Sequence, residues 1–320
     1  MARSARHVAR SAATPAGPHG SLSPIPRDGP LPCSFAQERI WQSASTALES
    51  AAFAMCSVTA LRGPIDLEAL RAALEHGVAR HEPLRTTFVE RGGRPLQVVH
   101  PPGHLHVPLT DVTQEPDPES RATELLRDEA SVPFDLERGP LLRFRLVRVG
   151  KNDHRLLRVS HHLVTDRRSW QVFVTDAMKA YESVRSGAPL PSSDRLQYAD
   201  FAAWERQRMN PGSSHCREQV AWWQQAFDPT PPILELPFTR PTPASGLAPG
   251  DGNVWWGVQP AVADAMDEIR RSEAGTRYTV RLAIFSALLA LETGQDEITV
   301  GTYIDNRRLA ETESMFGDFS

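Results

Sequence analysis

The stretch Ser160-His161-His162-Leu163-Val164-Thr165-Asp166 decides the local fold, because it lies where a β-strand is expected to pass into a helix. Before it, apolar residues alternate with arginines over 142–146, and a turn at 150–153 leads into a second strand over 154–160. After it, apolar side chains recur at helical spacing, at Trp170, Phe173, Val174, Ala177, Met178 and Tyr181. We therefore expect two adjacent strands followed directly by a long helix.

The two adjacent histidines are the residues in this stretch best suited to chemistry. Successive side chains of a strand point to opposite faces, so His161 and His162 cannot both line one site. One is expected to face a cavity, where an imidazole with an ordinary pKa of about 6.5 can act as a general base. The alternative is a purely structural histidine pair with Asp166 capping the helix, and the spacing alone leaves both interpretations open. A metal site is disfavoured, because the two histidines and Asp166 lack a further ligand on the same face.

The rest of the chain predicts a mixture of helices and strands. Strands are expected at 53–62, 253–258 and 298–302, with a hairpin of 86–89 and 95–99 around Gly92-Gly93. Helices are expected at 34–45, after the N-cap Asp66, and at 117–131, 198–208, 215–226, 261–272 and 280–292. Segment 187–193 is predicted to be a linker and 228–252 a loop. Strands and helices without strict βαβ repetition indicate an α/β or α+β architecture.

Composition excludes several classes of function. The chain of 320 residues carries 35 Lys and Arg against 39 Asp and Glu, a net charge of −4, which argues against nucleic acid as the main partner. The three cysteines are odd in number and have no CxxC spacing, so neither a disulfide framework nor a zinc site is expected. No apolar stretch is long enough to span a membrane. We expect a cytoplasmic protein without a membrane or nucleic-acid partner.

Several motifs, in order, resemble those of the condensation domains of nonribosomal peptide synthetases, members of the chloramphenicol-acetyltransferase-like acyltransferase superfamily. The resemblance covers roughly residues 31–320. The stretch from His161 to Asp166 matches the HHxxxD core motif. The other matching stretches are Ser34-Phe35-Ala36-Gln37-Glu38-Arg39-Ile40-Trp41, Arg80-His81-Glu82-Pro83-Leu84-Arg85-Thr86-Thr87-Phe88, Tyr198-Ala199-Asp200-Phe201-Ala202-Ala203-Trp204, and 293–307 with the pair Asn306-Arg307.

The resemblance implies two acetyltransferase-like lobes in a V with a tunnel between them. It implies amide bond formation between acyl and aminoacyl thioesters carried on the phosphopantetheine arms of partner carrier proteins, with no cofactor or metal held by the chain itself. Because the chain shows no adenylation or carrier sequence, we expect adenylation modules in trans. By position in the motif, His162 is the catalytic residue, which either accepts the amine proton or holds the amine for attack. His161 is the packing partner, and Asp166 pairs with Arg307 to tie the motif to the second lobe. Packing is the expected role of Tyr198, Trp204, Arg39 and Trp41.

Two departures from the family pattern shape the remaining expectations. Arg167 stands where the family has glycine, and it can crowd the tunnel, contact an anionic group or point to solvent. The chain stops at 315–320, inside a motif that normally continues, so the second lobe is expected to be C-terminally truncated. We expect a disordered Arg/Ser/Ala/Pro-rich extension at 1–30, the N-terminal lobe at 31–187, and a linker with a partial C-terminal lobe at 188–320.

These departures keep two alternatives to a condensation enzyme. The first is a non-catalytic condensation-like module that docks carrier or tailoring proteins, suggested by Arg167 and the short C-terminus. The second is a stand-alone acyltransferase with a soluble acceptor, because the chain shows no adenylation or carrier sequence.

Overall fold

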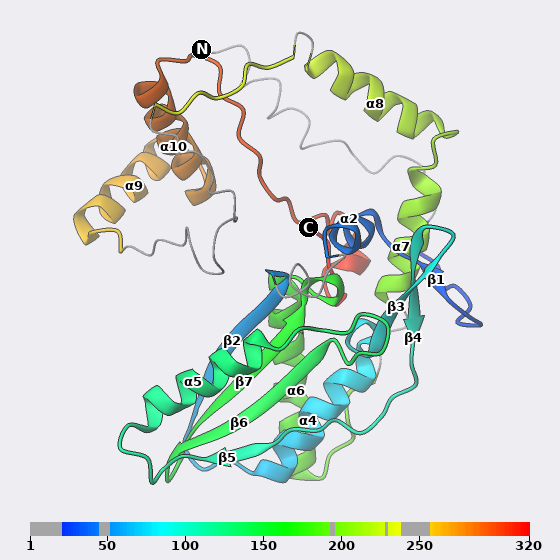
Figure 1. Cartoon of the computed structure of the whole chain (residues 1–320), viewed down its shortest axis with the longest axis vertical. Coiled ribbons are helices and arrows are strands. Elements are labelled where there is room, and N and C mark those ends of the chain that lie inside the picture. The colour runs from blue at the N-terminus through cyan, green and yellow to red at the C-terminus, as the bar shows by residue number, and fades with distance from the viewer. Residues whose placement is uncertain (1–20, 45–51, 193–195, 228–229, 238–256) are drawn as a thin grey trace, which may run out of the picture. The chain divides into compact units, whose positions relative to one another are not determined.

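The computed structural model describes residues 21–44, 52–192, 196–227, 230–237 and 257–320. The chain divides into two compact units, one formed by Met1–Cys216 with Ile304–Ser320 and one by Arg217–Tyr303. Figure 1 shows the sheets in the first unit and the helix pair α9–α10 in the second. The mixed α/β architecture expected from the sequence is confirmed.

A four-stranded sheet forms the centre of the first unit. Its strands are β2 (Ala54–Arg62), β5 (Leu109–Asp111), β6 (Leu142–Gly150) and β7 (Asp153–His161), in the order β2-β7-β6-β5. The pairs β2–β7 and β6–β7 are antiparallel, and β5 runs parallel to β6. Because Leu142 pairs with Ser160, the start of β6 lies beside the histidine motif at the end of β7.

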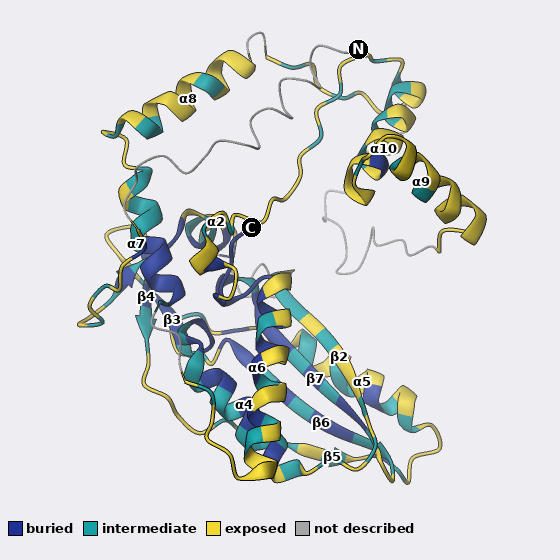
Figure 2. Cartoon of the chain, turned by 180° about the vertical axis from the view of Figure 1, so that it is seen from behind, coloured by how far each residue is buried: buried dark blue, intermediate teal, exposed yellow. Residues whose placement is uncertain are grey.

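Helices cover both faces of this sheet. Figures 1 and 2 show α4 (Leu67–Arg80) and α6 (Arg167–Ser186) on one face and α5 (Pro118–Ser131) on the other. Aromatic residues of α6, Trp170 and Phe173, pack with Phe144 of β6 in the largest apolar cluster. A Cβ atom at Gly77 of α4 would lie 2.5 Å from Cε2 of Phe173, so the glycine permits the close approach of the two helices.

The predicted N-cap Asp66 is confirmed, whereas the helix predicted from residue 280 begins earlier, at Arg277. Asp66 accepts a hydrogen bond from the backbone N–H of Ala69 at 3.0 Å and begins α4.

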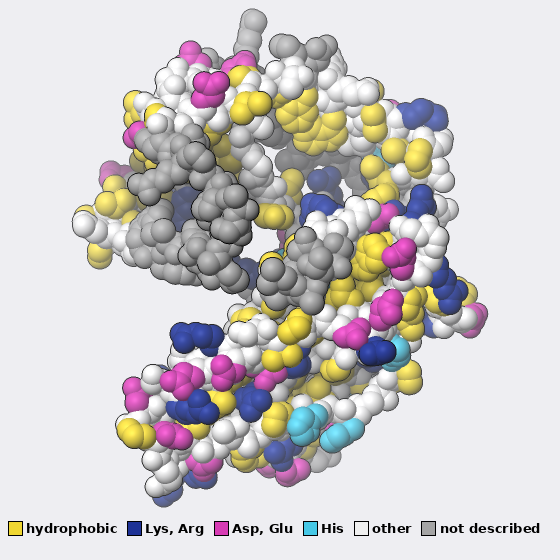
Figure 3. Space-filling view, in the orientation of Figure 1, with side chains coloured by type: hydrophobic (Ala, Val, Ile, Leu, Met, Phe, Trp, Pro, Cys, Tyr) yellow, Lys and Arg dark blue, Asp and Glu magenta, His cyan; other side chains and the backbone are white. Residues whose placement is uncertain are grey.

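On the α5 face, acidic and basic side chains lie interspersed over the helix and the sheet (Figure 3). Glu129 of α5, for example, pairs with Arg145 of β6 at 3.0 Å, so the two signs neutralise each other locally.

A smaller sheet packs beside the motif. It contains β1 (Leu31–Pro32), β3 (Thr86–Arg91) and β4 (Arg94–Val99) in the order β1-β4-β3, and the short helix η1 (Glu82–Arg85) precedes β3. The predicted hairpin is therefore confirmed. Helices α2 (Phe35–Ser43) and α7 (Tyr198–Arg208) lie near this sheet, and the short helix η3 (Ala310–Thr312) belongs to the C-terminal segment of the same unit.

Order begins earlier than the sequence predicted. Residues 21–30, expected to belong to a disordered extension, make defined contacts with the first unit. Leu22 is buried in a cluster with Tyr198 and Phe319. Arg27 forms ion pairs with Asp200 at 2.7 Å and with Glu82 at 2.9 Å. The composition of this segment did not reveal its order, because the partners lie far away in the sequence. Residues 1–20 of the expected extension lie outside the described residues.

The second unit is mainly helical where it is described. It contains most of α8 (Ser214–Ala226), together with α9 (Pro260–Ser272) and α10 (Arg277–Thr293). Asp267 of α9 pairs with Arg277 of α10 at 3.2 Å. Most side chains of α9 and α10 are exposed (Figure 2), and Phe285 of α10 is 48% exposed.

One predicted strand of the second unit is wrong. Residues 298–302 have no regular secondary structure, because none of the residues that the structure describes pairs with them as a strand. The predicted strand at 253–258 and the predicted loop at 228–252 lie largely outside the described residues.

None of the described helices is both long and apolar enough to cross a membrane.

Candidate functional site

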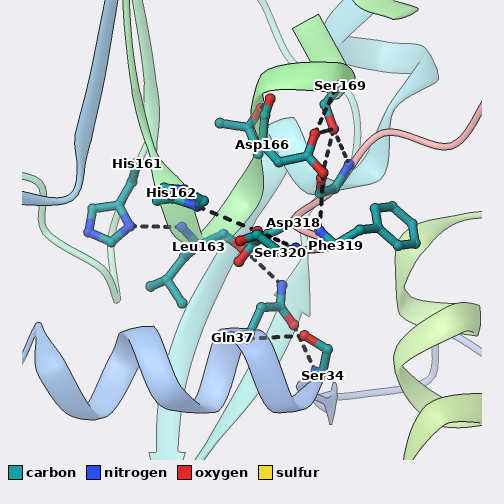
Figure 4. Close-up of polar contacts among 12 residues, drawn as sticks. Ser34, Gln37, His161, His162, Leu163, Asp166, Ser169, Asp318, Phe319 and Ser320 are labelled. Atoms are coloured by element: carbon teal, nitrogen blue, oxygen red, sulfur yellow. Dashed lines mark hydrogen bonds and ion pairs between the residues drawn. The ribbon is translucent and has the colours of Figure 1, made fainter. Parts of the chain in front are cut away.

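The histidine motif spans a sharp change of backbone geometry. Strand β7 ends at His161, the short helix η2 covers His162–Val164, and α6 begins at Arg167. The backbone N–H of His161 donates to the carbonyl of Leu141 at 3.0 Å, and that of His162 donates to the carbonyl of Phe53 at 2.9 Å. These bonds hold the two residues at the end of the central sheet, and their side chains diverge as the strand periodicity predicted (Figure 4).

His161 is fully buried in an aromatic environment. Its ring lies 6.1 Å from that of Phe53 and 5.8 Å from that of Phe134, with Phe134 in an edge-on arrangement. The backbone N–H of Leu163 donates to His161 Nδ1 at 3.1 Å. Because Nδ1 accepts this hydrogen bond, a neutral His161 carries its proton on Nε2. The contacts fit the expected packing partner of the motif.

Asp166 is the N-cap of α6 and is also held by an arginine. Its Oδ1 accepts hydrogen bonds from the backbone N–H and the hydroxyl of Ser169, both at 2.7 Å. Arg307 donates from Nη1 to Oδ2 at 2.6 Å and from Nη2 to Oδ1 at 3.2 Å, as a bidentate pair. The pairing expected from the family resemblance is therefore present, but Arg307 belongs to the first unit, so the pair does not tie that unit to the second.

The environment of Asp166 stabilises its charge. Burial by itself raises the pKa of this carboxyl, but the hydrogen bonds and the charge of Arg307 outweigh burial and lower the pKa below its ordinary value. The backbone N–H of Phe319 adds a hydrogen bond to Oδ2 at 3.1 Å. Asp166 thus anchors the start of α6 and the C-terminal segment in one network, with its oxygens directed at these partners.

The two ring nitrogens of His162 lie in different environments. Its side chain is 30% exposed, and its buried Nδ1 lies 3.5 Å from Oδ1 of Asp318. Burial alone lowers the pKa of His162, but the nearby Asp318 carboxylate, together with a smaller contribution from the backbone of His162, raises the pKa above its ordinary value. Nε2 lies on the exposed side of the ring, so this nitrogen can meet a substrate.

Asp318 is the residue that sequence reasoning missed. It lies near the end of the described chain, and nothing in its immediate sequence indicates a histidine partner. The segment lies against α7, because a Cβ atom at Gly317 would sit 2.0 Å from Cδ2 of Tyr198. The Tyr198 hydroxyl also contacts the backbone carbonyl of Asp318 and lies 2.8 Å from Ser34 Oγ. A tyrosine with an expected packing role therefore helps to place Asp318.

The opening motif supports the histidine loop from the other side. Ser34 caps α2 by accepting a hydrogen bond from the backbone N–H of Gln37 at 3.1 Å. The Gln37 side chain then donates to the backbone carbonyl of Leu163 at 3.0 Å (Figure 4). Helix α2 is thereby fastened to the turn that follows His162.

Two features lie away from this constellation. Arg167 is exposed in the first turn of α6, and its neighbour Arg168 lies 3.7 Å from Glu313. A cavity of about 660 Å³ borders the start of β6, and neither the motif histidines nor Asp166 contribute to its lining. The candidate site is therefore the exposed edge of His162 rather than this cavity.

Comparison with known proteins agrees with the motif and the fold. Residues 28–320 match the family described as Condensation domain. The chain is 37% identical over 305 residues to chondramide synthase cmdD of Chondromyces crocatus, covering 94% of this chain and 8% of that protein. It is 34% identical over 304 residues to malpibaldin synthetase of Mortierella alpina, covering 94% of this chain and 5% of that protein.

A solved structure shows the same fold. The first condensation domain of the CDA synthetase superposes with a TM-score of 0.75 at 21% identity, over 91% of this chain and 69% of that one. The chain thus spans a small part of the curated relatives and about two thirds of this solved domain. The match to the family over residues 28–320, together with the fold, shows that the chain belongs to the condensation-domain family of nonribosomal peptide synthetases.

Proposed function

We propose that this chain catalyses amide bond formation between two thioester substrates held on carrier proteins, with His162 as the catalytic residue. The observation that supports this most is the orientation of His162, whose Nδ1 faces a buried carboxylate while Nε2 lies on the exposed side of the ring. An imidazole held in this way can accept a proton from an amine that approaches from the open side. Family membership supplies the substrate class for the proposal.

The proposed reaction is an acyl transfer from sulfur to nitrogen. The acceptor amine attacks the carbonyl carbon of the donor thioester, so a C–N bond forms and the C–S bond breaks. His162 Nε2 takes the proton that the amine loses, and this proton then passes to the departing thiolate to give a free thiol. Holding the amine within reach of the thioester contributes further, because positioning lowers the entropic part of the barrier.

The other motif residues are proposed to position His162. His161 fills an aromatic pocket and fixes the end of β7, and Asp166 with Arg307 holds the start of α6. None of these three is proposed to touch the substrate, because their polar atoms are directed at buried partners. The partners in this proposal are carrier proteins whose phosphopantetheine arms bring the thioesters, which adenylation modules load.

The test uses two loaded carriers and detects the product by intact mass. The chain is mixed with an acyl-loaded donor carrier and an aminoacyl-loaded acceptor carrier, and the condensed product is followed on the acceptor. His162→Ala is expected to lower the rate by about 10²–10⁴-fold, the usual contribution of general acid–base catalysis. The matched control is His106→Ala, because His106 lies outside the motif and away from His162 in the sequence.

Three outcomes contradict the proposal in different ways. Unchanged turnover in His162→Ala removes His162 from the mechanism. Binding of the carriers without product in the unaltered chain indicates a docking module. Product formed only with a free amine or alcohol, and not with an acceptor carrier, indicates an acyltransferase with a soluble acceptor.

A further inference from the structure

Asp318 is a fully buried carboxylate, and apart from His162 few groups near it offset its negative charge. Oδ1 accepts hydrogen bonds from the backbone N–H of Ser320 at 3.2 Å and from the Ser320 hydroxyl at 2.6 Å. Oδ2 is buried and has no hydrogen-bond partner among the described residues. Within the described part of the chain no lysine or arginine pairs with Asp318, and its one ion pair is with His162.

A buried charge of this kind needs a cation or donor nearby. Removing a carboxylate from water is unfavourable unless opposite charge or hydrogen bonds replace the water. The nearby Arg307 does not serve Asp318, because its guanidinium is directed at Asp166 and Asp305. His162 is therefore the group whose protonation state responds to Asp318.

The carboxylate also selects the tautomer of His162. An ionised carboxylate only accepts hydrogen bonds, so the ring nitrogen that faces it favours the N–H form. With the proton on Nδ1, the neutral ring has its lone pair on Nε2, which is the exposed nitrogen. His161 is held in the opposite way, because its Nδ1 accepts from Leu163. Two neighbouring histidines are thus set to carry their protons on different nitrogens.

We propose that Asp318 is a positioning residue for His162, a buried carboxylate that holds the imidazole with its proton on Nδ1 and its lone pair on Nε2. The proposal rests on the function proposed above for the importance of Nε2, but the pairing itself is independent of it. Asp318 raises the pKa of His162 most, and the backbone of His162 and the charge of Asp166 contribute less. The charge of Asp166 is already matched by Arg307, and a backbone carbonyl carries no net charge. Asp318 is therefore the group that tunes this histidine.

The experiment follows the His162 ring by NMR in the substrate-free chain labelled with ¹⁵N-histidine. Asp318→Asn keeps the size of the side chain and removes its charge, so the pKa of His162 is expected to fall and the proton to redistribute between Nδ1 and Nε2. Ser320→Ala removes the hydroxyl that donates to Asp318 Oδ1, so the carboxylate charge is less offset and interacts more strongly with His162, whose pKa is expected to rise. The matched control is Glu311→Gln, an exposed carboxylate in the same segment, which is expected to leave the titration unchanged.

Kinetics give a second readout of the same variants. Asp318→Asn is expected to lower kcat by about tenfold or more with KM nearly unchanged, and to move the acid limb of the pH–rate profile to lower pH. Opposite shifts in Asp318→Asn and Ser320→Ala distinguish tuning by charge from general damage to the fold. The proposal is overturned if the pKa and tautomer of His162 are the same in both variants as in the unaltered chain.

The two proposals fail in different measurements. If His162→Ala retains full turnover while Asp318→Asn still shifts the His162 titration, the pairing is correct and the proposed catalytic role is wrong. If Asp318→Asn does not fold, Ser320→Ala decides the question through its expected upward shift, and an unchanged titration there rejects the pairing.

Discussion

His161 and His162 are adjacent in the chain but occupy two opposite environments. His161 is sealed between the rings of Phe53 and Phe134, whereas His162 lies between a buried carboxylate and an open edge. The aromatic pocket of His161 is built from residues near the central sheet. The polar pocket of His162 depends on the C-terminal segment at Asp318, more than 150 residues further along the chain.

The difference shows how one short motif gives His161 a packing role and leaves His162 available for chemistry. The alternation of a strand sends the two rings to opposite faces, and each face then supplies its own partners. Packing against aromatic rings stabilises His161 without needing a charge. A buried carboxylate next to His162 instead changes its proton affinity, so the two sides can be disturbed separately.

Phe134→Ala is expected to have the largest effect on stability and to disturb only the environment of His161. Phe134 is 5% exposed, packs edge-on against His161, and lies under the guanidinium of Arg143 at 4.0 Å. Removing a buried ring should lower the free energy of unfolding by about 3–5 kcal/mol, measured by urea denaturation. The pKa of His162 should stay unchanged in NMR titration of the folded variant.

The control for this prediction is Phe285→Ala, because Phe285 is 48% exposed and should cost less than about 0.5 kcal/mol. A shift of the His162 pKa in Phe134→Ala would show that the two environments are coupled.

Gly317→Ala is expected to have an intermediate effect and to disturb the His162 side. The added Cβ would lie 2.0 Å from the Tyr198 ring, so the C-terminal segment must move. Overpacking of this kind should lower the free energy of unfolding by about 1–3 kcal/mol. Displacing Asp318 should also bring the pKa of His162 back towards its ordinary value, in the same titration.

Gly103→Ala is the matched control, since no atom lies within 4 Å of the Cβ position there. If Gly317→Ala leaves both stability and the His162 titration unchanged, the close packing of this segment on α7 is wrong.

The pH dependence of stability should give the smallest effect and report the two ion pairs separately. The lowered pKa of Asp166 means that its contribution is present above the unfolded pKa of about 3.9 and is lost as pH falls through the folded pKa. The raised pKa of His162 means that its contribution is complete below about pH 6.5 and is lost as pH rises through the folded pKa. Urea denaturation across about pH 3–8 should therefore show a loss at each end.

Asp318→Asn tests whether the loss of stability on the alkaline side comes from the pairing of His162 with Asp318. The variant should remove the loss on the alkaline side, because the interaction that titrates there is absent, and should keep the loss on the acidic side. Equal changes at both ends would mean that the two ion pairs are not independent.

Local chemistry made much of the fold predictable. Asp66 and Ser34 begin helices because short polar side chains satisfy free backbone N–H groups, and that pattern is readable in the sequence. The divergence of His161 and His162 follows from the two-residue period of a strand. The pairing of Asp166 with Arg307 came from the family resemblance, since nothing in the local sequence joins two residues 141 positions apart.

The remaining features depend on contacts between distant segments. Residues 298–302 have the composition of a strand, but a strand needs a partner and the described residues provide none. Residues 21–30 have the composition of a polar extension, yet Arg27 is ordered by Asp200 and Glu82. Asp318 became part of the site only because Gly317 packs on Tyr198 and brings the carboxylate to His162.

The sequence by itself determined that the two histidines face different environments, because side-chain alternation is a property of the backbone. The tertiary structure alone decided the proton affinity and the favoured tautomer of His162, because electrostatic energy depends on distance in space and on burial. Both become defined only when the C-terminal segment folds against the motif.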